Sequence, residues 1–219
     1  MTVYLNFHGL GEPGANVDAD ERPYWLSADC FAEILGLIAP AADRVKITFD
    51  DGNETDLTVA LPLLQKKKLR ADFFIPTARI GAKGYLSEAN IKALRNARMG
   101  IGSHGAAHVR WTDIGDGELD FEICAPLERL SAITGDKVDT VAIPFGAYDR
   151  HVLAALKQRR VARVYTSDQG IAPPNSWLVA RNSVRSDMPL GTIQALIARA
   201  NSTAAMAKTF LRQAKRRVA

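Results

Sequence analysis

The sequence predicts an α/β fold, a distorted (β/α) barrel with about seven parallel strands, formed by a single domain over residues 1–219. Short apolar runs alternate with longer amphipathic stretches, a pattern typical of parallel strands joined by crossover helices. The length of 219 residues suits one α/β barrel better than two domains. No glycine-rich dinucleotide fingerprint is present, which favours a barrel over a Rossmann sheet.

The first part of the chain predicts two strands and two helices. Residues 3–7 form an apolar run typical of a buried strand, and residues 45–49 form a second. Between them, Ser27 is a suitable N-cap for an amphipathic helix. Residues 55–68 show helical spacing of leucines, although Pro62 inside this stretch is expected to kink or shorten the helix.

The middle of the chain continues the alternation. Residues 72–75 predict a third strand, closed by a proline, and residues 99–102 a short fourth one. Ser87 is expected to cap the helix between them. Residues 118–134 predict a long helix whose apolar face is expected to include Phe121.

The last part of the chain predicts three more strands, over residues 138–143, 161–165 and 177–180. Asp149 is expected to cap the helix that follows the first of them. One final helix is expected from about Leu190 through Phe210.

The charge of the chain is mildly basic, with a net charge of +4 and a pI of about 9.1. Several cations lie near the C-terminus: Arg212, Lys215, Arg216 and Arg217. We interpret them as a solvated helix end, and a weak contact with an anionic surface remains an alternative. No second basic block or aromatic interleaving indicates nucleic-acid binding. Cys30 and Cys124 are interpreted as buried, reduced thiols.

The N-terminus lacks the basic and apolar segments of a signal peptide, and no run of 18 apolar residues is present. We therefore expect a cytoplasmic protein without a transmembrane segment.

Candidate functional residues follow the strand ends, because active sites of parallel α/β folds lie at the carboxyl ends of the strands. The adjacent carboxylates Asp50 and Asp51 follow the second strand, and His104 follows the fourth. His8 follows the first strand and Asp168 the sixth. These polar side chains are expected to converge on one rim.

A metal site is the first interpretation of this rim. His104 and His108 are four residues apart, which would put both rings on one face if the segment turned helically. This spacing alone is often accidental. Two histidines and one carboxylate, from Asp51 or Asp50, form a three-ligand site typical of hydrolytic metal centres.

The paired aspartates support the same interpretation. Adjacent carboxylates repel each other, so a cation bound by one of them would keep both ionised. The other would be free to act as a base on water. A simple Asp-Asp-Gly turn would explain Gly52 but not the histidines.

Three segments of the sequence together resemble the motifs of one known family. Thr48-Phe49-Asp50-Asp51-Gly52, Ser103-His104-Gly105-Ala106-Ala107-His108 and Pro144-Phe145-Gly146 resemble the motifs of the polysaccharide deacetylase family, also called the NodB homology domain or carbohydrate esterase family 4. The resemblance implies a NodB-like barrel and a divalent metal ion, usually zinc, bound by Asp51, His104 and His108. It implies that Asp50 is the general base, and that Pro144 and Phe145 help to hold the oxyanion. The implied substrate is an N-acetylated sugar.

The chain departs from the family pattern at two points. The third motif usually begins with an arginine that orients the base, but Ala142 occupies that position, and Arg181 or Arg185 could replace it. No histidine follows His151 to serve as the usual general acid, and His8 is the natural substitute, as in members with permuted motif order.

Some roles stay open. Asp168 could fix an arginine or a substrate hydroxyl, or it could be a turn residue. Besides N-deacetylation, the sequence allows a glycan-binding protein with impaired catalysis, or hydrolysis of another small amide. Residues 11–24 and 77–85 are expected to set specificity, the first of these loops as a lid.

Overall fold

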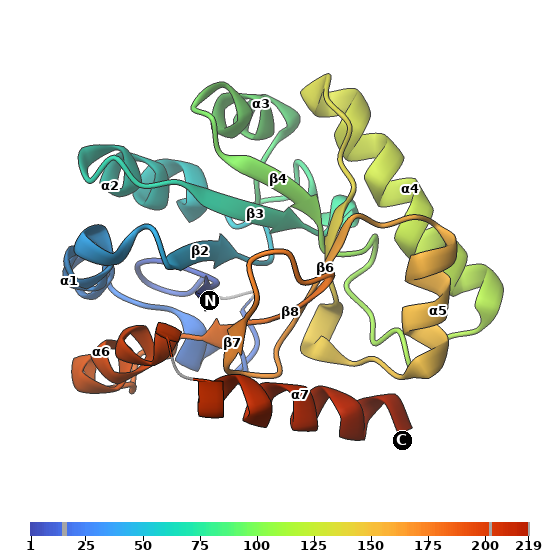
Figure 1. Cartoon of the computed structure of the whole chain (residues 1–219). Coiled ribbons are helices and arrows are strands. Elements are labelled where there is room, and N and C mark those ends of the chain that lie inside the picture. Colours follow the sequence, from blue (N-terminus) through green and yellow to red (C-terminus); the bar gives the residue numbers. More distant parts are fainter. Residues whose placement is uncertain (15–16, 202, 219) are drawn as a thin grey trace.

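The computed structural model describes residues 1–14, 17–201 and 203–218, which form a curled, mostly parallel sheet with helices on its outer side (Figure 1). The strands are β1 (Thr2–Phe7), β2 (Val45–Phe49), β3 (Ala71–Ile75), β4 (Gly100–Ser103), β5 (Thr140–Ala142), β6 (Arg163–Thr166), β7 (Ile171–Ala172), β8 (Leu178–Ala180) and β9 (Asn182–Ser183). The helices are α1 (Ala28–Ile38), α2 (Leu61–Lys66), α3 (Glu88–Asn96), α4 (Asp116–Thr134), α5 (Arg150–Gln158), α6 (Leu190–Ala198) and α7 (Thr203–Val218).

The seven predicted parallel strands are confirmed as β1 to β6 and β8, which pair in parallel along the order β1-β2-β3-β4-β5-β6-β8. Their carboxyl ends therefore meet at one end of the sheet. The sequence did not predict β7 and β9, because two residues are too few for an alternation pattern.

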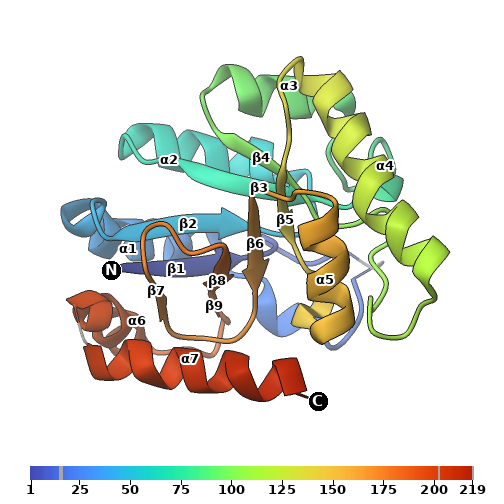
Figure 2. The ribbon, with the colours of Figure 1, turned by 45° about the vertical axis from the view of Figure 1, so that its right-hand side comes forward.

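The two short strands bring the sheet close to a barrel. β7 pairs antiparallel with β1, and β9 pairs in parallel with β1 through Leu5 and Asn182. The Asn182 side chain donates to the Tyr4 carbonyl at 3.1 Å. Because β9 directly follows β8, the last parallel strand is tied back to the first one. The α/β barrel prediction is thereby confirmed as a nearly closed barrel (Figure 2).

The predicted helix caps are confirmed at three positions. The side chain of Ser27 accepts from the Cys30 amide at the start of α1, and Ser87 forms a capping box at α3. Asp149 accepts from the Val152 amide at the start of α5. Each cap satisfies an amide that has no partner inside its helix.

The helix expected over residues 55–68 has two parts. A π-helical turn, Asp56–Ala60, leads into α2, and Pro62 lies in the first turn of α2. Proline is tolerated there because the first amides of a helix need no intrahelical acceptor. The wider turn thus places Pro62 where it breaks no α-helical hydrogen bond.

The single final helix was a wrong prediction. The segment divides into α6 and α7, with a 3₁₀ turn at Arg199–Asn201. Phe210 is 48% exposed, because α7 turns Thr209 and Gln213 inward. Phe121 on α4 was likewise expected in the core but is 60% exposed.

The thiols of Cys30 and Cys124 are free, as predicted, but half-buried rather than buried. Among the described residues, no helix is long and apolar enough to span a membrane.

Apolar side chains pack on both sides of the sheet wall. On the outside, one cluster lies under α1, α3 and α6, and a second lies under α4 and α5. Inside the barrel, Tyr4, Phe74 and Tyr165 form the centre of a third cluster. We call these three rings the aromatic plug. It separates the carboxyl end of the barrel from the amino end.

Candidate metal centre

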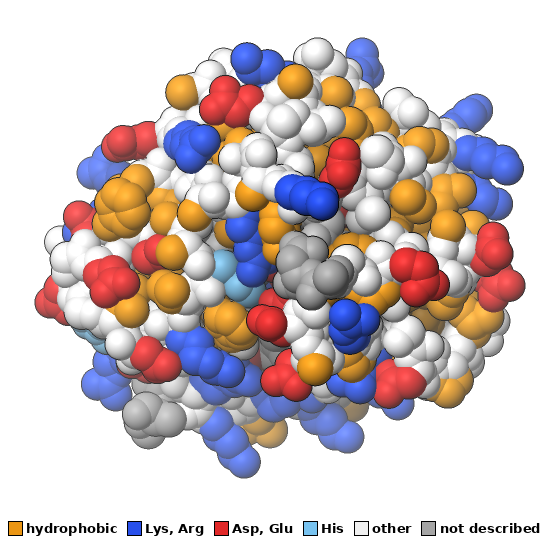
Figure 3. Space-filling view, turned by 180° about the vertical axis from the view of Figure 1, so that it is seen from behind, with side chains coloured by type: hydrophobic (Ala, Val, Ile, Leu, Met, Phe, Trp, Pro, Cys, Tyr) orange, Lys and Arg blue, Asp and Glu red, His pale blue; other side chains and the backbone are white. Residues whose placement is uncertain are grey.

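The predicted rim residues come together at the carboxyl ends of the strands. Asp50 and Asp51 follow β2 and His104 follows β4, and all three side chains are buried. Figure 3 shows histidine side chains at the bottom of a hollow, next to both acidic and basic side chains. The hollow is the candidate functional site.

Asp51, His104 and His108 form a group in which one ligand atom of each lies within 4.8 Å of the others. The Asp51 Oδ1 atom is 3.3 Å from His108 Nε2 and 3.9 Å from His104 Nε2. The left-handed backbone of Asp51, with φ of 77°, turns the chain between β2 and the following loop. The predicted ligand set therefore converges on one point.

The segment between the two histidines is a loop and does not turn helically. Gly105 and His108 both have positive φ, 77° and 57°. The loop is held by the buried Glu122 of α4, whose carboxylate accepts from the amides of Ala106 at 2.8 Å and Ala107 at 2.9 Å. A β-carbon on residue 105 would lie 2.6 Å from Glu122 Oε2, so the close approach requires glycine.

Several features fit a divalent cation. His104 Nδ1 is 2.8 Å from the Ala142 carbonyl, which favours the proton on Nδ1 and leaves Nε2 free to bind a metal ion. The buried Asp51 Oδ1 accepts no hydrogen bond within the described part of the chain. Burial, followed by the proximity of His104, lowers the pKa of His108 to about 3, so its ring is neutral, as a ligand must be. Two imidazoles and a carboxylate match the donor set of zinc and similar ions.

Arg79, which the sequence did not single out, also reaches this group. Its Nη1 atom is 3.3 Å from Asp51 Oδ1, and its Nη2 atom donates to His108 Nδ1 at 3.1 Å. A guanidinium only donates hydrogen bonds, so Nδ1 of His108 must be the acceptor in this contact. In a neutral His108 ring the proton then lies on Nε2. Binding of a metal ion through that nitrogen would require Arg79 to release Nδ1.

Asp50 is held by Arg181, a buried residue with no exposed surface. The guanidinium binds both carboxylate oxygens, each at 2.7 Å, and Asn6 donates to Oδ2 at 2.9 Å. Burial alone would raise the pKa of Asp50, but Arg181, with help from His104, lowers it. Arg181 thus makes the contact that the family pattern assigns to the arginine missing at Ala142.

Arg185 lies elsewhere. It forms an ion pair with Asp187 at 3.0 Å and stacks over the ring of Tyr24. Arg185 therefore pairs with a carboxylate other than Asp50.

His8 lies beside Tyr24, with 4.9 Å between the ring centroids. Its Nδ1 atom is buried and has no hydrogen-bond partner among the described residues. Burial is the main cause that lowers the pKa of His8, against the opposing effect of Asp51 and Asp50. The ring is therefore neutral and close enough to the two carboxylates to interact with them.

The predicted lid loop also borders the site. The ring of Tyr24 contacts the ring of His8 at a tilt of 45°, and Glu21 interacts electrostatically with Asp51 and Arg79. Residues 15 and 16 of this loop lie outside the described residues.

The turn after β5 contributes Pro144, which is buried, and Phe145, which is 49% exposed. Phe145 has a positive φ of 56°, an uncommon conformation for a bulky residue. Its ring lies 4.6 Å from the ring of His108 and under the guanidinium of Arg110. The turn therefore presents an aromatic face at the edge of the ligand group.

The buried Asp168 carboxylate binds other side chains of the protein. It accepts from the hydroxyls of Tyr148 at 2.7 Å and Thr166 at 2.6 Å, and it forms an ion pair with Arg216 of α7 at 3.2 Å. Of the open roles, the geometry favours fixing an arginine. Arg216 also donates to the Gly146 carbonyl at 2.5 Å, so it is not simply a solvated cation of the C-terminal helix. The side chain of Arg217 lies outside those described.

Comparisons with known proteins agree with this geometry. A family model described as polysaccharide deacetylase matches residues 38–164. The chain is 25% identical over 146 residues to YxkH of Bacillus subtilis, whose name provisionally assigns it to the polysaccharide deacetylases; the match covers 67% of this chain and 52%, about half, of that relative.

Solved structures show the same fold. A Streptococcus pyogenes deacetylase, PplD, determined in complex with acetate, superposes with a TM-score of 0.77 at 17% identity, covering 90% of this chain and 97% of the other. A polysaccharide deacetylase from Bacillus cereus superposes with a TM-score of 0.77 at 19% identity, covering 90% and 68%. IcaB from Ammonifex degensii gives a TM-score of 0.72 at 20% identity, covering 92% and 97%.

Proposed function

The chain belongs to the polysaccharide deacetylase family, and on that premise we propose that it is a metal-dependent N-deacetylase that hydrolyses acetamide groups of an N-acetylated glycan or glycan precursor. The observation that carries the proposal is the convergence of Asp51, His104 and His108 beside an arginine-bound Asp50. A carboxylate held next to a three-ligand group is the arrangement that water-activating hydrolases need.

The proposed ligands are Asp51, His104 and His108, and the proposed ion is zinc. When bound, such a cation polarises a carbonyl group and acidifies water. Glu122 shapes the loop that carries both histidines, and the Ala142 carbonyl orients the His104 ring. These contacts set the direction of the donor atoms before any ion arrives.

Asp50 is proposed as the general base. The lowered pKa keeps it ionised at neutral pH, and the two hydrogen bonds from Arg181 fix the direction of its oxygens. Asp50 would accept a proton from the water whose oxygen bonds to the acetamide carbon. The Asn6 amide adds a third constraint on the same carboxylate.

His8 is proposed as the general acid. As the carbon–nitrogen bond breaks, the sugar nitrogen must gain a proton. The neutral His8 ring would first take up the proton that Asp50 accepts from water and would then deliver it to that nitrogen; its electrostatic interaction with both carboxylates supports this transfer. The products are acetate and a free amine. A backbone amide near Phe145 is proposed to bind the oxyanion, and the exposed Phe145 ring to contact the sugar. Asp168 would support this turn through Arg216.

Catalytic impairment was an alternative because the motif arginine is missing at Ala142. The Arg181 contact with Asp50 supports an active enzyme, since the proposed base has an orienting partner from the segment between β8 and β9. Hydrolysis of a different small amide would use the same groups, and the substrate screen below distinguishes it.

The test combines metal content with turnover. We expect about one equivalent of zinc by mass spectrometry in the wild type, and acetate release from a chitooligosaccharide. His104→Ala should lose both, whereas the exposed His151→Ala should keep both. Fully zinc-loaded protein that releases no acetate would contradict the deacetylase proposal, and turnover of small amides alone would shift the substrate class.

A further inference from the structure

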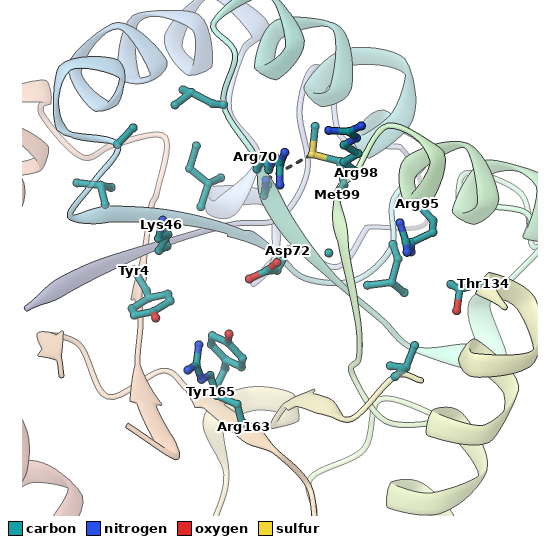
Figure 4. A pocket seen from close by; sticks show the side chains of 18 of the residues that line it. Tyr4, Lys46, Arg70, Asp72, Arg95, Arg98, Met99, Thr134, Arg163 and Tyr165 are labelled. Atoms are coloured by element: carbon teal, nitrogen blue, oxygen red, sulfur yellow. Dashed lines mark hydrogen bonds between the residues drawn. The ribbon is translucent and has the colours of Figure 1, made fainter. Parts of the chain in front are cut away.

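A cavity lies at the amino end of the barrel, away from the candidate metal centre. It has a volume of about 870 Å³ and is lined by the beginnings of β2, β3, β4 and β6. Figure 4 shows Asp72 pointing into it, with Tyr4, Lys46, Arg163 and Tyr165 around the carboxylate. The volume falls in the range of small-molecule sites, about 300–1,000 Å³.

The strand register explains which side chains face this cavity. Lys46 pairs with Tyr4, Asp72 with Gly100, and alternate residues of a barrel strand point inward. A β-carbon on residue 100 would lie 2.0 Å from Asp72 Oδ1. Glycine at this position therefore provides the room that the Asp72 side chain occupies.

The wall of the cavity is strongly basic. Among the described lining residues two are acidic, Asp72 and Asp136, against seven that are basic: Lys46, Lys68, Arg70, Arg95, Arg98, Lys137 and Arg163. Asp136 is already paired with Arg95. The lining thus carries excess positive charge, which attracts anions.

Helix ends account for only part of this charge. Lys68 and Arg98 follow the C-termini of α2 and α3, where cations offset the helix dipole. Lys46 and Arg163 lie on strands, so that explanation does not extend to them. These two cations flank the floor of the cavity and interact electrostatically with Asp72.

The floor is polar and aromatic. Tyr4 and Tyr165 meet edge to face, with 5.7 Å between their centroids, and both line the cavity. Asp72 adds a carboxyl group whose pKa is raised, chiefly by burial. Aromatic rings with hydroxyl and carboxyl groups suit a ligand that carries its own hydroxyls, and the surrounding cations suit a phosphate.

We propose that the amino-end cavity is a second ligand site, one that binds a phosphorylated sugar. The phosphate contacts Lys46 and Arg163, and the sugar hydroxyls bind Asp72 and the tyrosine hydroxyls. The aromatic plug separates this ligand from Asp50 and the ligand group. The site is independent of the proposed deacetylase chemistry.

Calorimetric titration with glucose 6-phosphate tests the proposal, with glucose and inorganic phosphate as the two halves of the probe. We expect saturable binding at least about tenfold tighter than that of either half. Lys46→Met and Arg163→Gln should each weaken it about tenfold, as expected for loss of a charge-assisted contact. The exposed Lys92→Met on α3 removes the same charge outside the cavity and should change the Kd less than twofold.

The Asp72→Asn variant distinguishes binding of the phosphate group from binding of the sugar. Removing a negative charge should tighten the binding of inorganic phosphate. Loss of the carboxylate that accepts from the sugar hydroxyls should weaken the binding of glucose 6-phosphate. If the variant bound both probes more tightly by the same factor, the proposed contact between Asp72 and the sugar hydroxyls would be contradicted. Absence of saturable binding by the wild type would overturn the site, as would equal weakening by Lys92→Met and Lys46→Met. Binding to phosphatidylglycerol vesicles without binding of glucose 6-phosphate would also overturn it in favour of an anionic surface.

Discussion

The two ends of the barrel hold charge in different ways. At the carboxyl end, Arg181 is fully buried and binds both oxygens of Asp50. At the amino end, Lys46 is exposed, and Arg163 is half-buried and donates to the Pro174 carbonyl. The comparison shows where the fold fixes a charge in one orientation, as acid–base chemistry requires, and where it leaves cations able to adapt to a ligand.

The largest expected effect is a difference in stability between variants at the two ends of the barrel. Arg181→Met leaves a buried carboxylate without its cation, so we expect a loss of about 3–5 kcal/mol in the free energy of unfolding. Arg163→Met, the matched change at the amino end, should cost about 1 kcal/mol or less. Urea unfolding of metal-free protein measures both. Similar losses in the two variants would show that the ends are not held differently.

The second effect concerns the loop between His104 and His108. Glu122→Gln removes one of the two acceptors for the Ala106 and Ala107 amides, so both histidines should lose alignment. We expect zinc affinity to fall about 10- to 100-fold, as for other groups that orient ligands. Competition with a chelator measures it. Glu128→Gln on the exposed side of α4 is the control, and equal affinities in the two variants would contradict the role of Glu122.

The third effect tests whether Arg79 opposes metal binding. Arg79→Met removes a cation beside the ligand group and frees His108 Nδ1. Zinc should bind about fivefold more tightly, the equivalent of about 1 kcal/mol. Arg185→Met, at an arginine bound elsewhere, should leave the Kd unchanged. Weaker zinc binding by Arg79→Met would mean that Arg79 instead holds His108 in position.

The fourth effect is a pH dependence at His8. Its pKa is lowered in the folded state, so unfolding takes up a proton below the usual histidine pKa of about 6.5. Stability should therefore fall as the pH drops from 6.5, and His8→Gln should reduce the slope by at most about 1.4 kcal/mol per pH unit. Urea unfolding at several pH values, with His151→Gln for comparison, measures this. An unchanged slope would contradict a neutral His8 in the folded state.

Much of the fold and the ligand group could be predicted from the sequence. Seven apolar runs marked the parallel strands, and the strand-end rule selected Asp50, Asp51 and His104, with His108 four residues later. The family resemblance then favoured Asp51 over Asp50 as the carboxylate of the group. These signals are local: a buried strand is apolar, and a ligand follows it at a fixed point.

The rest depends on contacts between distant segments. Glu122 looks like any polar residue of an amphipathic helix, and only the packing of α4 against the histidine loop shows its role. Arg79 and Arg181 likewise have no local signature, so Arg181 and Arg185 were equal candidates until the barrel closed around Asp50. The exposed Phe121 shows the same limit, because helical spacing alone did not identify the buried face.

The bond between Asp50 and Arg181 also orders events during synthesis. The two residues are 131 positions apart in the chain. At 5–20 residues per second, the ribosome adds Arg181 roughly 7 to 26 s after Asp50. During that interval the carboxylate has no buried cation to meet, so the nascent barrel cannot close over it at low cost. An oriented Asp50 therefore arrives late, and a chain that stops before Arg181 would leave the ribosome with Asp51, His104 and His108 but without the partner that orients Asp50.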